Sequence, residues 1–558
     1  TVDPRYVSFT LDWWPSDQGS PYPPPQGWGP HANVLQVDLQ SPKLRVLVTA
    51  LGPSILRIGG TLDKTVQYDI PSSHASCSHG AENNNHDDNN NQYNNEQSTA
   101  PPPCLNASRW DELHEFARAT NAQIVFGLSY PLVGDSNNNT NKYDDGHWNS
   151  SQAAALMMYS QQSNYTRQTT LRGFELGEEL TRYRVGTLAF ENYVKAYHKC
   201  AGLLRTIYGG ADDDNDDGSS LRPRLMGPCP GMSWPLLSTW FSAFLDATNG
   251  ALDVAVYHSY NQIELPDKLY VNTSVPDISN QSTSSPGDTG WQAIAMKGFV
   301  DNANRKNKGG TPLSLWLGEM GPHNGGGGPG EISSSFASSF GYMDTLGTLA
   351  RLNHQVLARQ TLVGGKYELL RCSTGVDNIC DFEPQPDYWV ALLWSRLMGT
   401  TVLEPPGGDD ASGDNDGTTW KKDLHFHSHC SSSSSNDISG ANNNGSITIA
   451  FSNKSPNISY IFPTSQWGPK RVEYVVKGHV ESSNLTQKKA NDQFNTKIVE
   501  LNGNVLRMGD TSRLPPLEGR RVSNTPNNPW VISPVSLGFL VFPDAGEPAC
   551  NKKAPKVK

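Results

Sequence analysis

The first 399 residues alternate short apolar segments with longer segments of helical periodicity, and this alternation constrains the fold more than any other feature. Eight segments have the length and apolar content of buried strands. They are Tyr6–Trp14, Ile55–Gly59, Gln123–Leu128, Gly173–Gly177, Arg224–Met226, Leu252–His258, Leu313–Gly318 and Gln355–Val363. Strands that alternate with helices form parallel sheets, and eight such units favour a closed (β/α)8 barrel over an open sheet.

The helical segments between and after these strands carry apolar residues at the spacing of an amphipathic helix. They are Trp110–Ala119, Leu188–Ile207, Leu236–Ala247, Trp291–Arg305, Phe336–Leu352 and Asp387–Met398. The last of them follows the eighth strand, so residues 1–399 are predicted to form a barrel domain. A low-complexity insertion at residues 72–103 interrupts it.

After residue 399 the pattern changes to short β-branched and aromatic runs with no helix of useful length. These runs are Ser446–Phe451, Arg471–Val476, Ile498–Leu501 and Val531–Phe542. Residues 400–558 are therefore predicted to form an all-β sandwich domain, joined to the barrel by a linker at Thr400–Asn443.

Charge and hydropathy exclude several classes of partner. The formal net charge is −11 and no basic run is longer than a pair, which disfavours nucleic acid and highly sulfated glycans. No apolar run approaches the roughly 20 residues that cross a bilayer, so no transmembrane segment is expected. The acidic run Asp212–Gly218 matches only the first half of an EF-hand loop, because Arg224 stands where the closing glutamate belongs. A solvated loop is favoured there over a calcium site, and no metal is predicted.

Eight cysteines without a CxxC metal pattern favour disulfides, which persist outside the cytosol. They are Cys77, Cys104, Cys200, Cys229, Cys372, Cys380, Cys430 and Cys550. Cys77 and Cys104 flank the low-complexity insertion, so we expect them to be bonded to each other.

Ten N-glycosylation sequons point to the same secretory route. They begin at Asn106, Asn138, Asn149, Asn164, Asn272, Asn280, Asn444, Asn453, Asn457 and Asn484. The chain starts at Thr1 without a charged, apolar leader, as expected of a mature secreted protein. We expect a glycoprotein that is extracellular, at a cell surface or wall, or in a lysosome or vacuole.

Two predicted strand ends carry carboxylates suited to cleaving a glycosidic bond. Glu178 and Glu179 follow the fourth strand, and Glu319 follows the seventh. Strands four and seven lie on opposite sides of a barrel, and barrel enzymes place their catalytic groups at these carboxyl ends. Cleavage needs one carboxylic acid to protonate the leaving oxygen and one carboxylate to attack or to activate water. A single glutamate after a strand is usually an ordinary loop residue, but this placement favours Glu179 and Glu319 as a catalytic pair. Glu175 is expected to point the other way and to be structural.

Long motifs run nearly from end to end of the chain. Besides the two glutamate motifs they are Thr10–Pro15, Leu56–Thr61, Ser108–Leu113, Arg359–Gly365, Pro386–Trp389 and Phe542–Pro543. In these motifs the chain resembles glycoside hydrolase family 79, the heparanase-like enzymes, particularly their secreted plant branch. The resemblance implies a barrel with a β-sandwich that retains configuration while hydrolysing β-linked glucuronic acid or its 4-O-methyl form, without metal or cofactor. It also implies that Glu179 is the general acid/base and Glu319 the nucleophile.

The resemblance further implies how the sugar carboxylate is held. Backbone N–H groups of a glycine-rich loop that includes Gly325 and Gly326 bind it, helped by Tyr367 with Gln360 nearby. Glycine lets the backbone approach closely, and paired N–H groups bind an anion without a lysine. A flexible turn is the alternative for these glycines.

Other cleft residues follow from the same resemblance. Asp12 and Thr61, which end strands one and two, match positions that bond sugar hydroxyls. His258 and Tyr260 end strand six and are expected to line the cleft, although packing at the strand end is nearly as good an explanation.

Glu178 departs from the family pattern, in which an asparagine precedes the acid/base and bonds the sugar 2-hydroxyl. Like-charge repulsion raises the pKa of at least one of two adjacent carboxyls, which helps keep Glu179 protonated as an acid. The same charge also repels an anionic sugar. The rival interpretation is therefore a catalytically inactive, carbohydrate-binding or structural extracellular glycoprotein on the same fold.

We also propose three further disulfides: Cys200–Cys229, Cys372–Cys380 and Cys430–Cys550. Both ends of the last match paired positions in the plant branch, where the bond would clasp the sandwich. Within the enzyme interpretation, the acidic net charge favours small or plant-type glucuronides over heparan sulfate.

Overall fold

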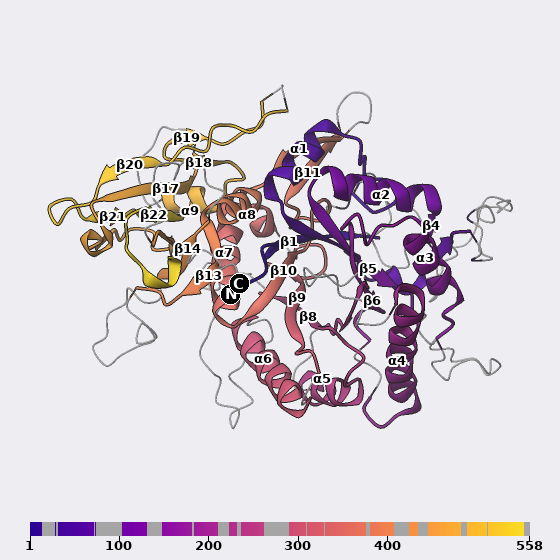
Figure 1. The fold of residues 1–558 in the computed structure, drawn as a ribbon. Coiled ribbons are helices and arrows are strands. Elements are labelled where there is room, and N and C mark those ends of the chain that lie inside the picture. Colours follow the sequence, from indigo (N-terminus) through magenta and orange to yellow (C-terminus); the bar gives the residue numbers. More distant parts are fainter. Residues whose placement is uncertain are drawn as a thin grey trace, which may run out of the picture.

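Eight parallel strands close into a barrel, as the alternating pattern predicts (Figure 1). In order of pairing they are β1 (Val7–Asp12), β10 (His354–Arg359), β9 (Ser314–Gly321), β8 (Val254–Tyr260), β7 (Arg224–Pro228), β6 (Leu171–Leu176), β5 (Ala122–Leu128) and β2 (Ser54–Gly59). The ring closes because β1 pairs in parallel with both β10 and β2. Apolar side chains, among them Ile55, Val254 and Trp316, fill the interior near the start of the strands, so the barrel is a packed core.

This computed structural model describes the elements and the site through the following residues. They are 1–13, 28, 32–71, 73, 77, 103–130, 148–180, 184–209, 222–231, 236–261, 289–307, 310–328, 330–374, 380–406, 423–432, 445–480, 488–509 and 512–551. The acidic run at 212–218 and most of the insertion at 72–103 lie outside them.

Eight helices surround or follow the described barrel strands. They are α1 (Pro42–Leu51), α2 (Ala107–Ala119), α3 (Ser151–Gln162), α4 (Leu188–Tyr208), α5 (Leu236–Ala247), α6 (Thr289–Lys306), α7 (Phe336–Arg351) and α8 (Pro386–Leu397). Six of them lie where helices are predicted, whereas α1 and α3 were missed. The start of α1 does carry a recognisable signal, because the Ser41 hydroxyl accepts a hydrogen bond from the Leu44 N–H and Pro42 occupies the first turn.

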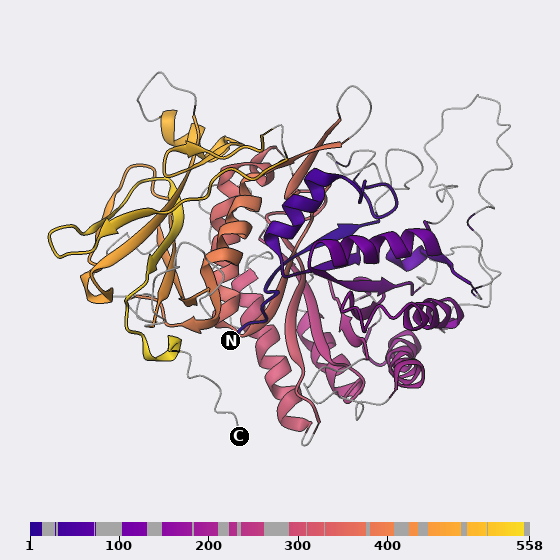
Figure 2. The ribbon, with the colours of Figure 1, turned by 45° about the horizontal axis from the view of Figure 1, so that its top comes forward.

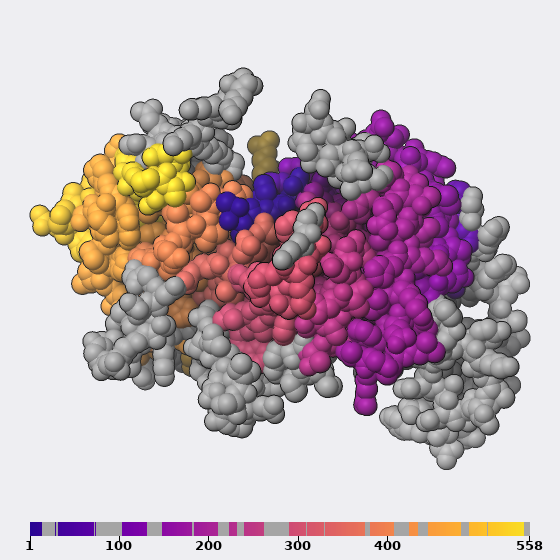
Figure 3. All heavy atoms as spheres, turned by 60° about the horizontal axis from the view of Figure 1, so that its bottom comes forward, coloured from indigo at the N-terminus to yellow at the C-terminus, as the bar shows by residue number. Residues whose placement is uncertain are grey.

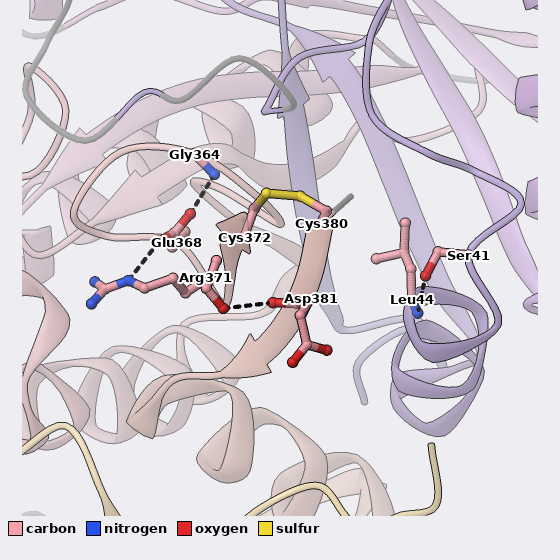
Figure 4. Close-up of a disulfide and its surroundings, with 9 residues drawn as sticks. Ser41, Leu44, Gly364, Glu368, Arg371, Cys372, Cys380 and Asp381 are labelled. Carbon is pink, nitrogen blue, oxygen red and sulfur yellow. Dashed lines mark hydrogen bonds and ion pairs between the residues drawn. A yellow bond between two sulfur atoms is a disulfide. The ribbon is translucent and has the colours of Figure 1, made fainter. Parts of the chain in front are cut away.

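Two small strand pairs lie outside the barrel. They are β3 (Gln67–Asp69) with β4 (Cys104–Asn106) and β11 (Leu370–Thr374) with β12 (Cys380–Pro384). The second pair follows β10 and is closed by the Cys372–Cys380 disulfide (Figure 4). Just ahead of it, the Glu368 carboxylate accepts hydrogen bonds from the Gly364 N–H at 2.8 Å and from Arg371 Nε at 3.1 Å. These contacts fix the loop between β10 and β11, which carries Tyr367.

The C-terminal region is antiparallel β structure, as predicted. Its main sheet has the order β13 (Met398–Leu403), β14 (Leu424–Ser431), β15 (Ile447–Asn453), β22 (Ser536–Phe542), β17 (Lys470–Gly478), β18 (Val499–Leu501) and β19 (Asn504–Val505), with β20 (Arg520–Ser523) beside β17. A two-stranded sheet of β16 (Tyr460–Phe462) and β21 (Trp530–Ile532) shares an apolar core with it.

Three details of that region were predicted wrongly. The stretch taken for a linker contains β13 and β14, the predicted run Val531–Phe542 is divided into β21 and β22, and a short helix α9 (Lys488–Asn495) occurs. β14 was not recognised as a strand because His425, His427 and His429 alternate with its other residues. Its sequence therefore lacks the usual strand pattern of alternating apolar residues.

Helices α7 and α8 lie between the barrel and the main C-terminal sheet (Figures 1 and 2). Asp344 on α7 accepts hydrogen bonds from His425 Nδ1 at 2.8 Å and from His427 Nε2 at 3.0 Å, both on β14. At the start of the chain, the Val2 N–H donates to the Thr400 carbonyl on β13 at 2.9 Å. The N-terminal residues accordingly appear on the surface at the junction of the two regions (Figure 3).

The cysteines form three of the four predicted disulfides, namely Cys77–Cys104, Cys372–Cys380 and Cys430–Cys550. The fourth prediction was wrong, because Cys200 and Cys229 are free and buried. Cys200 lies on α4 in the core outside the strands, whereas Cys229 belongs to the core inside the barrel. The wall of the barrel separates the two thiols.

One glycosylation prediction is also wrong. Asn453 is fully buried on β15, and its amide nitrogen donates to the carbonyls of Ile458 and Ser533. Four sequon asparagines are exposed: Asn106, Asn149, Asn164 and Asn457. The remaining sequons, at Asn138, Asn272, Asn280, Asn444 and Asn484, lie outside the described residues. No helix in the described parts of the chain is long and apolar enough to span a bilayer.

Candidate active site

Arg57, in the middle of β2, is the centre of a buried charge cluster at the barrel mouth. Its Nε lies 2.7 Å from Glu175 Oε2 and its Nη2 lies 2.7 Å from Glu178 Oε2. Its Nη1 lies 3.1 Å from Glu319 Oε2. Since Arg57 is only 2% exposed, these ion pairs compensate for the loss of its hydration.

Arg57 was not predicted to have a role, and the predicted direction of the Glu175 side chain was wrong. Glu175 points at Arg57 and is buried with it, so it belongs to the cluster. A charged residue inside an apolar strand was the signal for Arg57, because charged side chains are almost never fully buried unless they are paired.

Glu319 reaches the barrel interior because of a bulge in β9. Trp316 pairs with Val256 and faces the interior, so strict alternation would turn Glu319 outward. The register shifts by one residue at Gly318, and Glu319 pairs instead with His258. A side chain at Gly318 would lie 2.4 Å from a Val256 methyl group, which explains why this position holds a glycine.

Glu179 is held by the ends of β6 and β7. Its backbone N–H donates to the Cys229 carbonyl at 3.1 Å, and its φ is +51°, an uncommon conformation for a residue other than glycine. Its side chain is 39% exposed, so it borders the open end of the barrel. Backbone strain of this kind occurs preferentially at functional sites, where the surrounding structure imposes it.

His258 joins the carboxylates of the two strand ends. Its Nδ1 lies 3.1 Å from Glu179 Oε1, 3.5 Å from Glu178 Oε1 and 3.9 Å from Glu319 Oε2. One oxygen of each of the three glutamates and one ring nitrogen of His258 all lie within 4.8 Å of one another. The structure thus brings Glu179 and Glu319, the two predicted catalytic glutamates, together with Glu178 and His258.

This set also contains ligands that a divalent cation accepts. Arg57 already provides a positive charge to Glu178 and Glu319, and His258 lies against all three carboxylates. A metal ion would therefore compete with the cations that the chain itself supplies.

The cluster shifts the pKa values of its members in different directions. Burial, reinforced by the charges of Glu319 and Glu179, raises the pKa of Glu178 to about 7 despite Arg57 and His258. Burial also tends to raise the pKa of Glu179, but the hydrogen bond and charge of His258 outweigh it and lower that pKa. Burial alone would lower the pKa of His258, yet the facing carboxylates raise it to about 9.

Asp63, just beyond β2, is a member of the cluster that sequence reasoning missed. It is fully buried, and neither carboxyl oxygen has a hydrogen-bond partner among the described residues. Burial and the charge of Glu178 raise its pKa well above the ordinary value. Its surroundings therefore favour the protonated form of Asp63 more than water does, and nothing in its local sequence indicated this.

The remaining predicted residues extend the site from Glu319 toward β1. The Tyr260 hydroxyl donates to Glu319 Oε1, and the rings of Tyr260 and Tyr367 lie 6.4 Å apart. Gln360 Nε2 donates to Asp12 Oδ2 at 3.0 Å and to the Tyr367 hydroxyl at 3.4 Å. These five side chains form one continuous polar wall.

The glycine-rich loop lies against the same wall. The Lys366 N–H donates to the Gly326 carbonyl at 2.7 Å, which holds the loop beside Tyr367. Among the described residues, the N–H groups of Gly325 and Gly326 have no acceptor, and both glycines have positive φ. Thr61 is exposed next to the ends of β1 and β2.

A (β/α)8 barrel with glutamates converging from its fourth and seventh strands is the architecture of a glycoside hydrolase. Glycosidases of this class use a pair of their own carboxyl groups to cleave glycosidic bonds in carbohydrates. The chain belongs to glycosyl hydrolase family 79, whose N-terminal domain model matches residues 1–347.

Relatives cover nearly the whole chain. Heparanase-like protein 3 of Arabidopsis thaliana is 28% identical over 99% of this chain and 92% of its own length. Baicalin-beta-D-glucuronidase of Scutellaria baicalensis is 28% identical over 100% of this chain and 92% of its own length. A 4-O-alpha-L-rhamnosyl-beta-D-glucuronidase structure from Fusarium oxysporum matches with a TM-score of 0.54 and 12% identity, covering 97% and 96% of the two chains. This last likeness concerns the fold alone.

Proposed function

We propose that the chain hydrolyses glycosides of β-linked glucuronic acid with retention of configuration. The observation that carries this proposal is the approach of Glu179 and Glu319: one oxygen of each lies within 4.8 Å of the other, although their strands, β6 and β9, are three apart in the barrel. Retaining enzymes hold their two carboxyl groups about 5–5.5 Å apart, whereas inverting enzymes leave about 6.5–9.5 Å for a water molecule. The spacing supports retention.

In the proposed mechanism Glu319 attacks the anomeric carbon while Glu179 protonates the leaving oxygen. Arg57 and Tyr260 each contact one oxygen of Glu319, and these two contacts orient its carboxyl group. Glu179 then deprotonates the water that releases the glycosyl-enzyme. Its exposed position suits contact with both leaving group and water.

The sugar carboxylate is proposed to lie at the glycine-rich loop. The N–H groups of Gly325 and Gly326, which have no acceptor among the described residues, are available to donate hydrogen bonds to an anion, and Tyr367 lies beside them. Asp12 and Gln360, with the exposed Thr61, are proposed to bond sugar hydroxyls from the other end of the polar wall. The similarity to baicalin-beta-D-glucuronidase supports a glucuronide substrate.

A second candidate function rests on Glu178. This carboxyl stands where the related motif has an asparagine, and it adds potential negative charge beside an anionic sugar. The alternative is a carbohydrate-binding protein on the same fold with no hydrolytic activity.

Hydrolysis of aryl β-D-glucuronides by the wild type and Glu319→Gln separates the two candidates. We expect turnover by the wild type, a β-configured first product by NMR, and loss of turnover in the variant. Adding azide to Glu319→Ala is expected to restore consumption of an activated substrate and to give the α-glucuronosyl azide, because azide replaces the missing nucleophile. A wild type that binds glucuronides but leaves a panel of glucuronides and hexosides intact supports the binding protein instead.

The chain is also proposed to be secreted, or lysosomal or vacuolar, and N-glycosylated. The three disulfides and the exposed sequon residues Asn106, Asn149, Asn164 and Asn457 support this. Glycopeptide mapping of protein expressed in a eukaryotic secretory host tests it, with Asn453 expected to be unmodified.

A further inference from the structure

Among the described residues, Nδ1 of His258 is the proton-carrying atom that contacts both Glu178 and Glu179. It lies 3.1 Å from Glu179 Oε1 and 3.5 Å from Glu178 Oε1. The imidazole ring is fully buried, and Nε2 has no hydrogen-bond partner in the described structure. Exchange of a proton by His258 must therefore occur at Nδ1, on the side of the two carboxyl groups.

Glu179 needs a proton before the first chemical step but is poorly placed to keep one. His258 Nδ1–H donates to Glu179 Oε1, and a protonated imidazole favours the ionised carboxylate. Burial acts in the opposite direction, yet the pKa of Glu179 lies below its ordinary value. An acid in this state requires a second group that holds the proton.

Resting on the proposed function, we propose that Glu178 stores the proton that Glu179 delivers to the leaving group, and that His258 Nδ1 passes it between them. The protonated His258 gives the Nδ1 proton to Glu179 Oε1, and the neutral Nδ1 then accepts the proton of Glu178 Oε1. One O–H bond breaks and one O–H bond forms, while His258 regains its original state. After the water attacks, the same steps run in reverse and return the proton to Glu178.

The surroundings of Glu178 stabilise both its protonated and its ionised form. Burial raises its pKa to about 7, so it holds its proton in weakly acidic solution. When the proton leaves, Arg57 Nη2 at 2.7 Å already compensates the new charge. The titratable groups around it come from five barrel strands and the segments that follow them: Arg57 (β2), Asp63 (after β2), Glu175 (β6), Glu179 (after β6), Cys229 (after β7), His258 (β8) and Glu319 (β9).

Asp63 and Cys229 do not compete with Glu178 for Arg57. Burial and the charge of Glu178 keep the pKa of Asp63 well above its ordinary value. Burial and the charge of Glu175 do the same for the Cys229 thiol. Neither group forms an ion pair or hydrogen bond with Arg57 among the described residues, whereas Glu178 does.

The test compares two aryl β-glucuronides that differ in their need for an acid. A 4-methylumbelliferyl glucuronide needs its leaving group protonated, whereas a 2,4-dinitrophenyl glucuronide does not. At about pH 6, Glu178→Gln is expected to lower kcat/KM on the first substrate at least about tenfold and on the second by no more than about twofold. In Glu178→Gln, the alkaline limb of the pH profile of kcat/KM for the first substrate is expected to move to lower pH, because Glu179 must then hold the proton itself.

Glu175→Gln is the matched control. Glu175 forms an equally short ion pair with Arg57, at 2.7 Å, but makes no contact with His258 among the described residues. Whatever its rate, this variant is expected to keep the alkaline limb of the wild type. Two outcomes overturn the proposal that Glu178 stores the proton. Either the alkaline limb moves equally in both variants, or the pH profile of Glu178→Gln superimposes on that of the wild type. In both cases Glu178 is only a counterion of Arg57.

Infrared titration of Glu368→Gln, which keeps Glu178, covers the case in which Glu178→Gln does not fold. This variant removes the other carboxyl whose pKa burial raises to about 7, so the C=O stretch of the protonated Glu178 is expected to disappear with a midpoint near that value. If no carboxyl titrates near neutral pH, the proposal is overturned, even when the protein hydrolyses glucuronides. A wild type inert on both substrates rejects the proposed function itself, which is a separate outcome.

Discussion

Two buried charge clusters of this molecule are built in opposite ways. At the barrel mouth four carboxyl groups, Glu175, Glu178, Glu179 and Glu319, face two cationic side chains, Arg57 and His258. At the junction between α7 and β14 a single carboxylate, Asp344, faces His425 and His427. Acids outnumber bases in the first cluster, and bases outnumber acids in the second.

The pKa shifts follow this balance. Burial and excess negative charge raise the pKa of Glu178 to about 7. Burial acts on Asp344 in the same direction, but the charges and hydrogen bonds of His425 and His427 outweigh it and lower the pKa of Asp344 well below its ordinary value. The junction cluster therefore adds stability to the folded state, whereas the mouth cluster holds groups in states that favour chemistry over stability.

Removing the acid at the mouth should have the largest effect on activity and only a small effect on stability. Glu179→Gln is expected to lower kcat/KM about 10²–10⁴-fold on glucuronides with poor leaving groups, the usual contribution of general acid catalysis. Its unfolding free energy should fall only slightly, because the contact with His258 that lowers the pKa of Glu179 also stabilises the folded state, but at a side chain that is 39% exposed. Chemical denaturation alongside kinetics measures both, and a marked loss of stability would contradict the comparison.

Removing the cation at the mouth should have the opposite signature. Arg57→Met leaves Glu175, Glu178 and Glu319 without their shared partner, and such uncompensated buried charge costs about 3–5 kcal/mol of unfolding free energy. Denaturant titration at neutral and mildly acidic pH measures it. The deficit should shrink in acid, where the carboxyls become neutral, and Arg351→Met, which removes a cation paired with the exposed Glu404, is the matched control.

Breaking the junction should lower stability and leave chemistry intact. Asp344→Asn is expected to cost about 2–3 kcal/mol of unfolding free energy, the scale of hydrogen bonds to a charged group. Because the folded pKa of Asp344 is depressed, its contribution is present above the unfolded pKa of about 3.9 and is lost as pH falls through the folded value. The wild type should thus lose stability in acid more steeply than the variant. Equal pH slopes for the two proteins would show that the junction does not act through this carboxylate.

Crowding the acid by one methyl group should have the smallest effect. A side chain at Gly231 would lie 2.5 Å from the Glu179 carboxyl carbon, so Gly231→Ala must displace that carboxyl group. A misplacement of this kind is expected to lower kcat/KM about 10–100-fold. Stability should change little, since Glu179 can turn toward solvent. Steady-state kinetics with a melting curve checks this, and unchanged kinetics would mean that the carboxyl position seen here is not the reactive one.

The sequence was sufficient for the barrel and for its two catalytic candidates. Buried parallel strands are read as continuous apolar runs, and a glutamate directly after such a run must lie at the barrel mouth. All eight barrel strands were found for this reason, with ends that differ from the structure by a few residues.

The contacts that organise the site were beyond the sequence, because they depend on register and on distant partners. Alternation along β9 predicts an outward Glu319, and only the bulge at Gly318 turns it to His258. Arg57 meets glutamates from two other strands, far away in the chain. The same limitation explains the wrong Cys200–Cys229 pair, since spacing along the chain does not reveal which side of the barrel wall a thiol faces.

The three disulfides have a consequence for how the protein responds to a reducing environment. One anchors the edge of the insertion to β4, one closes the β11–β12 hairpin, and one ties Cys550 to β14. None joins one barrel strand to another, so the ring that carries both candidate catalytic glutamates is closed by hydrogen bonds and packing alone. Dithiothreitol should therefore loosen the periphery of the molecule first, and turnover should outlast the loss of the sulfur cross-links.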